Sequence, residues 1–160
     1  MNQASPGGAV LVIDADPLML TAVAAVLNIS GYECHCARDR EAALKAAQGL
    51  PLDLIVCDVD LEGQQGLELC RELRSAPGCQ DIPLIFVSGE PASDMVRRAH
   101  DAGGVYYLRK PYDPEVLLEL VEKALWMPHL VRSRVAAPHV LQPSAARGTT
   151  GDPSRLREPK

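Results

Sequence analysis

The segment LIVCD at residues 54–58 decides the fold expected for this chain. Four consecutive apolar residues with β-branched members are typical of a strand that is buried on both faces, in the middle of a parallel sheet. Asp58 ends the run, so its carboxylate is predicted to lie at the carboxyl edge of that sheet. Open α/β folds bind their ligands at this edge.

Other apolar runs also end in a polar or charged residue. Residues 10–13 lead into Asp14, 84–87 into Ser88, and 106–108 into Arg109 and Lys110. If all these strands are parallel, two carboxylates, one hydroxyl and one ammonium group meet at a single edge. The sequence therefore predicts a site for a phosphoryl group and a divalent cation.

Strands and helices are expected to alternate along the chain. Strands are predicted at about 9–13, 32–37, 53–57, 83–87 and 105–108, and helices at about 17–30, 40–48, 66–75, 92–102 and 114–126. Asp16, Asp39 and Asp113 stand where N-cap residues belong, and proline follows Asp16 and Asp113 at the first helical position. Five βα units with short connections predict an α/β fold with a doubly wound, five-stranded parallel sheet.

The charge distribution divides the chain into two parts. Residues 1–126 carry a net charge of −9 and residues 127–160 carry +4, which gives the whole chain −5. An acidic body argues against nucleic acid as a direct partner, because such binding requires neutralised phosphates. We expect a folded domain over 8–127 and a disordered, basic, Pro- and Arg-rich tail over 128–160, which is too short to form an output domain.

The sequence has no long apolar run, and its first residues lack a charged segment followed by an apolar core, so we expect no signal peptide, no membrane association and a cytoplasmic location. The five cysteines show neither a CxxC motif nor a metal-knuckle spacing, and we interpret them as reduced thiols. Cys34 and Cys36 lie two apart in a predicted strand, so they point to the same side of it.

Four motifs in order give the chain a family resemblance. They are IDAD at 13–16, LIVCDVDLEGQQG at 54–66, LIFVSGE at 84–90 and YYLRKPYD at 106–113. From about residue 10 to 126 the chain resembles the receiver domain of two-component response regulators, of the single-domain type found among chemotaxis regulators. The resemblance implies a flavodoxin-like strand order, 2-1-3-4-5.

The resemblance also implies a function. Asp58 would accept a phosphoryl group from a histidine kinase or a histidine phosphotransfer protein in a phosphorelay, with Mg²⁺ as cofactor. Asp14 and Asp58 would hold the metal together with the backbone carbonyl of Asp60. Hard oxygen ligands suit Mg²⁺, and in-line phosphoryl transfer depends on positioning and on cations. The chain would not be an enzyme beyond self-phosphotransfer and autodephosphorylation.

Further positions match the family pattern. Lys110 and Ser88 would contact phosphoryl oxygens, a cis bond before Pro111 would shape the loop, and Tyr107 would be an aromatic switch. The switch would bias the face formed by the segments at about 92–102, 105–108 and 114–126. That face would bind a downstream protein target or a second copy of the chain.

Some positions depart from the family pattern. Receivers usually carry two adjacent acids after the first strand, but here the second is Ala15. Asp16 follows it, either as the missing ligand or, because Pro17 comes next, as the cap of the first helix. Losing a ligand should weaken Mg²⁺ binding. Asp60 and Glu90 stand at positions that tune phosphorylation rates in the family, and like charges there oppose an incoming phosphodonor.

Two alternative functions stay open at this point. One is a pseudo-receiver, an interaction module that keeps the fold without efficient phosphorylation, as Ala15, Asp60 and Glu90 suggest. The other is an electron carrier or small hydrolase with the same strand order. The acidic loop at 14–17 disfavours the latter, because a phosphate cradle needs glycine and hydroxyl residues with free backbone N–H groups.

Overall fold

The computed structural model of the chain describes residues 7–89 and 93–126. Its main sheet has five parallel strands in the order β2-β1-β3-β6-β7. The strands are β1 (Ala9–Ile13), β2 (Glu33–Ala37), β3 (Leu54–Asp58), β6 (Leu84–Ser88) and β7 (Gly104–Arg109). Numbered within this sheet alone, the order is 2-1-3-4-5, which confirms the predicted topology.

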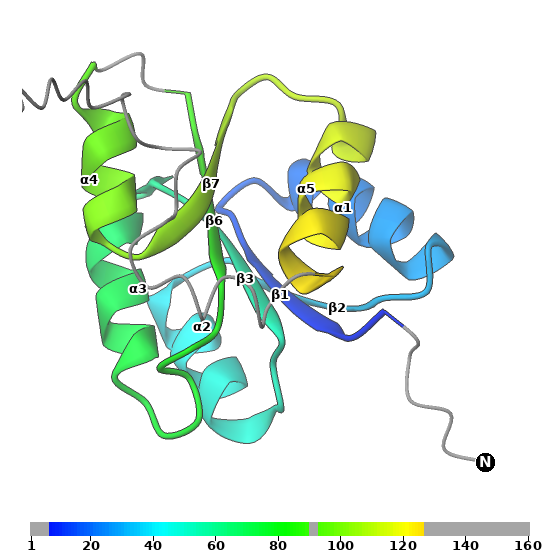
Figure 1. Cartoon of the computed structure of the whole chain (residues 1–160), viewed down its shortest axis with the longest axis horizontal. Coiled ribbons are helices and arrows are strands. Elements are labelled where there is room, and N and C mark those ends of the chain that lie inside the picture. Colours follow the sequence, from blue (N-terminus) through cyan, green and yellow to red (C-terminus); the bar gives the residue numbers. More distant parts are fainter. Residues whose placement is uncertain (1–6, 90–92, 127–160) are drawn as a thin grey trace, which may run out of the picture.

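Within the described residues, five helices cover the two faces of the sheet, as Figure 1 shows. They are α1 (Pro17–Ile29), α2 (Arg40–Gly49), α3 (Gly66–Arg74), α4 (Met95–Asp101) and α5 (Pro114–Trp126). Helices α1 and α5 lie on one face, and α2, α3 and α4 lie on the other. The result is a three-layer α/β/α domain.

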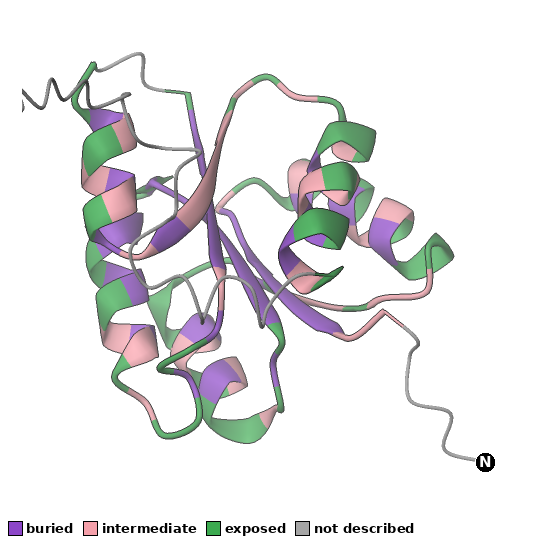
Figure 2. Cartoon of the chain, in the orientation of Figure 1, coloured by how far each residue is buried: buried purple, intermediate pink, exposed green. Residues whose placement is uncertain are grey.

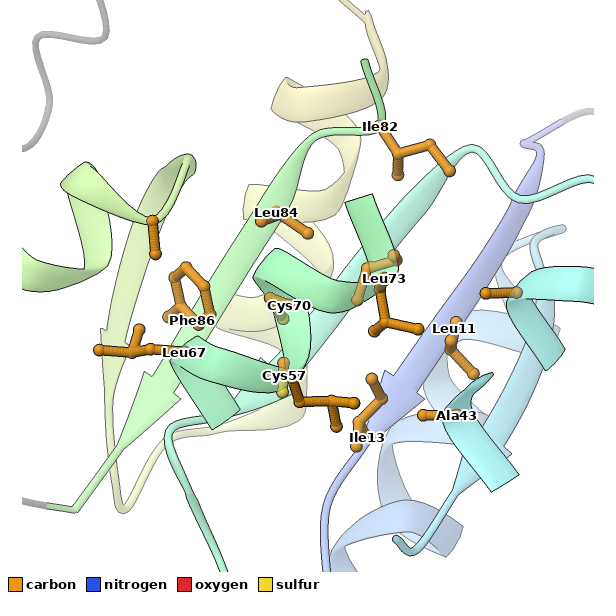
Figure 3. Close-up of a cluster of buried hydrophobic side chains, with 14 of the residues drawn as sticks. Leu11, Ile13, Ala43, Cys57, Leu67, Cys70, Leu73, Ile82, Leu84 and Phe86 are labelled. Carbon is orange, nitrogen blue, oxygen red and sulfur yellow. The ribbon is translucent and has the colours of Figure 1, made fainter. Parts of the chain in front are cut away.

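Each face of the sheet has its own apolar core, because successive side chains of a strand point to opposite faces. In β1, Leu11 and Ile13 join the core under α2, α3 and α4, whereas Val10 and Val12 join the core under α1 and α5. Figure 3 shows part of the first core, in which Phe86 lies among side chains from α3 and β3. The central strands are buried along their whole length (Figure 2).

Aspartates begin the helices as predicted. The side chain of Asp16 accepts a hydrogen bond from the N–H of Leu18 at 3.0 Å, and Asp39 accepts one from Ala42 at 2.8 Å. Asp113 accepts a hydrogen bond from the N–H of Glu115 at 3.0 Å. These bonds satisfy N–H groups that have no partner within the helix.

The structure differs from the prediction in the connection after β3. The sequence predicts neither a strand nor a helix between residues 57 and 66, but β4 (Asp60–Leu61) and β5 (Gln64–Gln65) form a small antiparallel hairpin there. Its tight turn contains Gly63 at a φ of 72°, which glycine adopts without strain. Two-residue strands carry too little apolar alternation to be recognised in a sequence.

The predicted helix at 92–102 is also shorter in the structure, where α4 begins at Met95. Residues 90–92 and the proposed tail at 128–160 lie outside the described residues. Among the described helices, none has the length and apolar composition required to cross a membrane.

Candidate functional site at the carboxyl edge of the sheet

Two carboxylates and one ammonium group meet at the carboxyl edge of the central strands. Asp14 follows β1, Asp58 ends β3 and Lys110 follows β7. The Nζ atom of Lys110 lies 3.0 Å from Oδ2 of Asp14 and 2.6 Å from Oδ2 of Asp58. The two acids are only 4% and 5% exposed, so the predicted cluster is present and nearly buried.

The backbone orients both carboxylates. Oδ1 of Asp58 accepts a hydrogen bond from the N–H of Asp60 at 2.9 Å, and Oδ1 of Asp14 accepts one from the N–H of Asp16, also at 2.9 Å. Each acid therefore directs one oxygen to its own loop and the other to Lys110. This arrangement leaves little rotational freedom in either side chain.

The charges of the cluster depend on one another. Burial raises the pKa of Asp58 above its ordinary value, although hydrogen bonds from Lys110 and from the N–H of Asp60 oppose the rise. Burial disfavours the charged form of Lys110, but its hydrogen bonds to Asp58 and Asp14 outweigh burial and raise its pKa. When both carboxylates are ionised, they outnumber the one ammonium group, and the resulting negative charge of the cluster suits a cation.

Ser88 and the loop after β7 complete the edge. Ser88 ends β6, is fully buried, and its carbonyl accepts a hydrogen bond from the N–H of Lys110 at 2.8 Å. The peptide bond between Lys110 and Pro111 is cis, as the family resemblance implied. Tyr107 is half-buried, pairs in register with Phe86, and packs against the core under α2, α3 and α4.

Gly66 is a structural residue of the site that sequence reasoning did not single out. A Cβ atom at this position would lie 2.0 Å from the backbone oxygen of Asp58. The N–H of Gly66 also donates to the carbonyl of Val59 at 2.7 Å, so the start of α3 rests directly on the end of β3. A glycine as the first residue of a helix was the available signal, because glycine is a poor helix former.

The oxygen donors fit Mg²⁺ in kind, but they are few. Mg²⁺ keeps several waters and is usually bound through one or two carboxylates, which Asp14 and Asp58 supply. The described residues contain no group of three His, Cys, Asp or Glu side chains placed to hold a metal ion. Ala15 offers no oxygen from its side chain, and Asp16 directs its own to the N–H of Leu18.

The structure thus brings together Asp14, Asp58, Ser88 and Lys110. It places the side chain of Asp16 at the helix cap, and Glu90 lies outside the described residues. Asp60 is exposed, in the hairpin beside Asp58.

Comparison with known proteins points to the same family as the four sequence motifs. Residues 10–122 match the family model described as "Response regulator receiver domain". Over 115 residues, the chain is 30% identical to the heme response regulator HssR of Staphylococcus aureus. Over 136 residues, it is 31% identical to the two-component response regulator PprB of Pseudomonas aeruginosa. These alignments cover 72% and 83% of this chain, which spans about half the length of each relative (50%).

Solved structures of receiver proteins share the fold of this chain. The chemotaxis response regulator CheY4 of Vibrio cholerae is 27% identical, with a TM-score of 0.69, and the match covers 74% of this chain and 98% of that one. A CheY-like receiver domain protein of Methanospirillum hungatei has a TM-score of 0.71 at 24% identity, over 77% of this chain and 97% of that one. At that identity, the second match shows a shared fold.

Proposed function

This chain belongs to the response regulator receiver domain family, and we propose that it is a phosphorylation switch whose acceptor is Asp58. The observation that carries the proposal is the contact of a single ammonium group, on Lys110, with the carboxylates of Asp14 and Asp58. In the proposed reaction, an oxygen of Asp58 attacks the phosphorus of a phosphohistidine. A P–O bond forms, the P–N bond breaks, and an acyl phosphate results.

The residues around Asp58 have distinct proposed roles. The ammonium group of Lys110 has three N–H donors and lies at the end of a flexible side chain. It can therefore move from the carboxylate of Asp58 to an oxygen of the bound phosphoryl group. Ser88 would donate its hydroxyl to another phosphoryl oxygen. Asp14, Asp58 and the backbone carbonyl of Asp60 would hold Mg²⁺, which supplies the positive charge needed against an anionic donor. Asp60 and Glu90 would slow the approach of that donor.

We extend the proposal to partners and output. A sensor histidine kinase or a histidine phosphotransfer protein would supply the phosphoryl group. The added charge would bias the face formed by α4, β7 and α5 through Ser88 and Tyr107, toward a protein target or a second copy of the chain. Residues 8–127 would suffice for this activity, with 128–160 as a tail.

A pseudo-receiver is the second candidate function, and the absence of a side-chain oxygen at Ala15 favours it. With only two carboxylates to hold a metal and the charge of Asp60 close by, binding of Mg²⁺ and of an anionic donor are both weakened. Such a protein would bind its partners in one state only. Phosphorylation itself distinguishes the two functions.

The protein is expected to form one phosphate adduct when it is incubated with acetyl phosphate and Mg²⁺, because acetyl phosphate is a small donor that needs no kinase. Intact mass spectrometry measures the adduct. An Asp58→Asn variant is expected to form none, because the amide is not a nucleophile of this kind. Asp53→Asn is a matched control, since Asp53 precedes the same strand at the opposite edge and hydrogen bonds to the N–H of Ala9.

The outcomes of this experiment are separable. Failure to form an adduct over a range of Mg²⁺ and donor concentrations would establish the pseudo-receiver. An adduct that persists in Asp58→Asn would place the acceptor at another residue.

Ala15→Asp is expected to tighten Mg²⁺ binding about tenfold or more, because it adds a carboxylate next to Asp14. Isothermal calorimetry on the full chain measures the affinity without any phosphodonor. Ala15→Asn is the matched control, because it adds a similar side chain without the negative charge and should have a smaller effect. Equal affinities in wild type and Ala15→Asp would mean that Asp16 leaves the helix cap and already serves as the missing ligand.

A further inference from the structure

An open groove lies at the amino edge of the sheet, at the opposite end of the strands from Asp58. It is lined by Gly7, which precedes β1, by Tyr32, which precedes β2, and by the second half of α5. Its volume is about 640 Å³, which is large enough for several side chains. Anything that binds in this groove stays away from the acceptor site.

The floor of the groove is apolar and aromatic. The ring of Tyr32 lies directly on Gly7, because a Cβ atom at Gly7 would lie 2.4 Å from a ring carbon. Tyr32 and Leu125 are half-buried and pack against the core under α1 and α5. Trp126 borders the groove and is 79% exposed, and no other aromatic ring within the described residues is exposed. A large apolar surface left open beside a groove is typical of a binding surface.

Helix α5 gives the groove its charge. Glu119, Glu122, Lys123 and Trp126 follow the spacing i, i+3, i+4 and i+7, so they share one face of the helix, and all four line the groove. When the two carboxylates are ionised, they outnumber the one ammonium group. Guanidinium groups pair with carboxylates and stack on the faces of tryptophan and tyrosine rings. The groove therefore suits an apolar peptide that carries arginine.

The chain itself has such a peptide at the border of the groove. Residues 127–160 begin directly after Trp126, and their first part, MPHLVRSRV at 127–135, contains two arginines, several apolar residues and no acid. Residues 1–6 also reach the groove, through Gly7, but their sequence MNQASP contains neither arginine nor lysine. Charge complementarity therefore favours the segment after α5.

This segment is long enough to follow the charged face of α5. Glu119 and Trp126 lie roughly 10 Å apart along the helix axis, at about 1.5 Å per residue. Residues 130–134 span up to roughly 17 Å when they are extended. Pro128 cannot donate a backbone hydrogen bond to a helix, so the chain is free to turn there. The segment can therefore turn back and run beside the whole charged face.

We propose that residues 128–135 fold back over the groove and cover Trp126. Their two arginines pair with the carboxylates of Glu119 and Glu122, and their apolar side chains pack on the aromatic floor. The proposal gives a defined place to the first part of a segment that composition alone predicts to be disordered. It does not depend on phosphorylation of Asp58, which lies at the other edge of the sheet.

Acrylamide quenching of fluorescence in the full chain tests the proposal, because Trp126 is the only tryptophan. Collisional quenching follows exposed surface. Arg132→Glu/Arg134→Glu should therefore raise the quenching constant about threefold, because it returns a covered indole to its 79% exposure. Arg155→Glu/Arg157→Glu is the matched control. It changes the net charge equally, farther along the chain, and should be quenched as wild type is.

Reversing the charges of the groove should expose the indole in the same way. We expect Glu119→Arg/Glu122→Arg to raise the quenching constant, and the combination of these changes with Arg132→Glu/Arg134→Glu to restore the wild-type value, because the paired charges are again opposite. Glu115→Arg is the control, since Glu115 is an exposed acid of α5 that does not line the groove.

Several results would overturn the proposal. Equal quenching in wild type and Arg132→Glu/Arg134→Glu would mean that Trp126 is uncovered, or that another segment such as residues 1–6 covers it. An equal effect of the control variants would reduce the role of the arginines to overall charge. Protection that is lost on dilution of wild type would assign the groove to a second copy of the chain.

Discussion

Gly66→Ala is expected to lower the free energy of unfolding by about 3 kcal/mol or more, at the upper end of overpacking effects. The new methyl group would lie 2.0 Å from the backbone oxygen of Asp58 and 3.0 Å from Cα of Val59. Backbone atoms of a buried central strand cannot move aside as the end of a flexible side chain can. The start of α3 must then separate from the end of β3.

Urea denaturation measures the loss of stability, and the melting temperature should fall by roughly 10 °C or more. Helix propensity alone predicts the opposite sign, because alanine is better than glycine in a helix by about 1 kcal/mol. Gly49→Ala is the matched control, since it changes a helical glycine with nothing within 4 Å of the added methyl group. It should be neutral or slightly stabilising.

If Gly66→Ala proved as stable as wild type, the close contact between α3 and β3 would not constrain the connection that follows Asp58. We also expect Gly66→Ala to form less phosphate adduct than wild type. The N–H of Asp60 orients the carboxylate of Asp58, and Asp60 belongs to the connection that the substitution displaces.

Lys110→Ala is expected to destabilise the protein by about 2 kcal/mol at neutral pH and to remove most of the phosphate adduct. Removing one partner of a fully buried ion pair costs about 3–5 kcal/mol, and we reduce this value because the Lys110 side chain is 25% exposed. The loss of the ammonium group leaves the carboxylates of Asp14 and Asp58 facing each other without a counter-charge. It also removes the cation proposed to face the phosphoryl group.

Urea denaturation, measured first with a chelator and then with Mg²⁺, tests whether the lost stability comes from the missing counter-charge. A divalent cation should recover part of the lost stability, because it replaces the missing charge. Lys123→Ala removes an exposed lysine of α5 and should change neither stability nor adduct formation measurably. Equal losses in the two variants would show that Lys110 acts through overall charge and not through its contacts.

Several features of this fold were predictable because they depend on local patterns. Apolar runs gave the central strands, and Asp16 and Asp39 gave the starts of α1 and α2. The prediction failed in the connection after β3, where two-residue strands form a hairpin that depends on Gly63 and on pairing between Asp60 and Gln65. It also placed the start of α4 too early. Short elements carry too few residues for their own periodicity to define them.

The sequence predicted which residues meet at the site, but it did not predict the contacts between them. Parallel strands that end in Asp14, Asp58 and Ser88 must bring these residues to one edge, whatever the details of packing. The hydrogen bonds of the two aspartates, in contrast, depend on a group that is distant in the chain. The ammonium group of Lys110 reaches Asp14 across 96 sequence positions and Asp58 across 52.

The sequence by itself determined the order of the elements, the polar strand ends and the departure at Ala15, because these features follow from local composition and periodicity. Only the tertiary structure decided that Lys110 contacts both acids and that Gly66 rests on the backbone of Asp58. Such contacts depend on distances of a few tenths of an ångström. The packing of the whole domain sets these distances, and no local pattern encodes them.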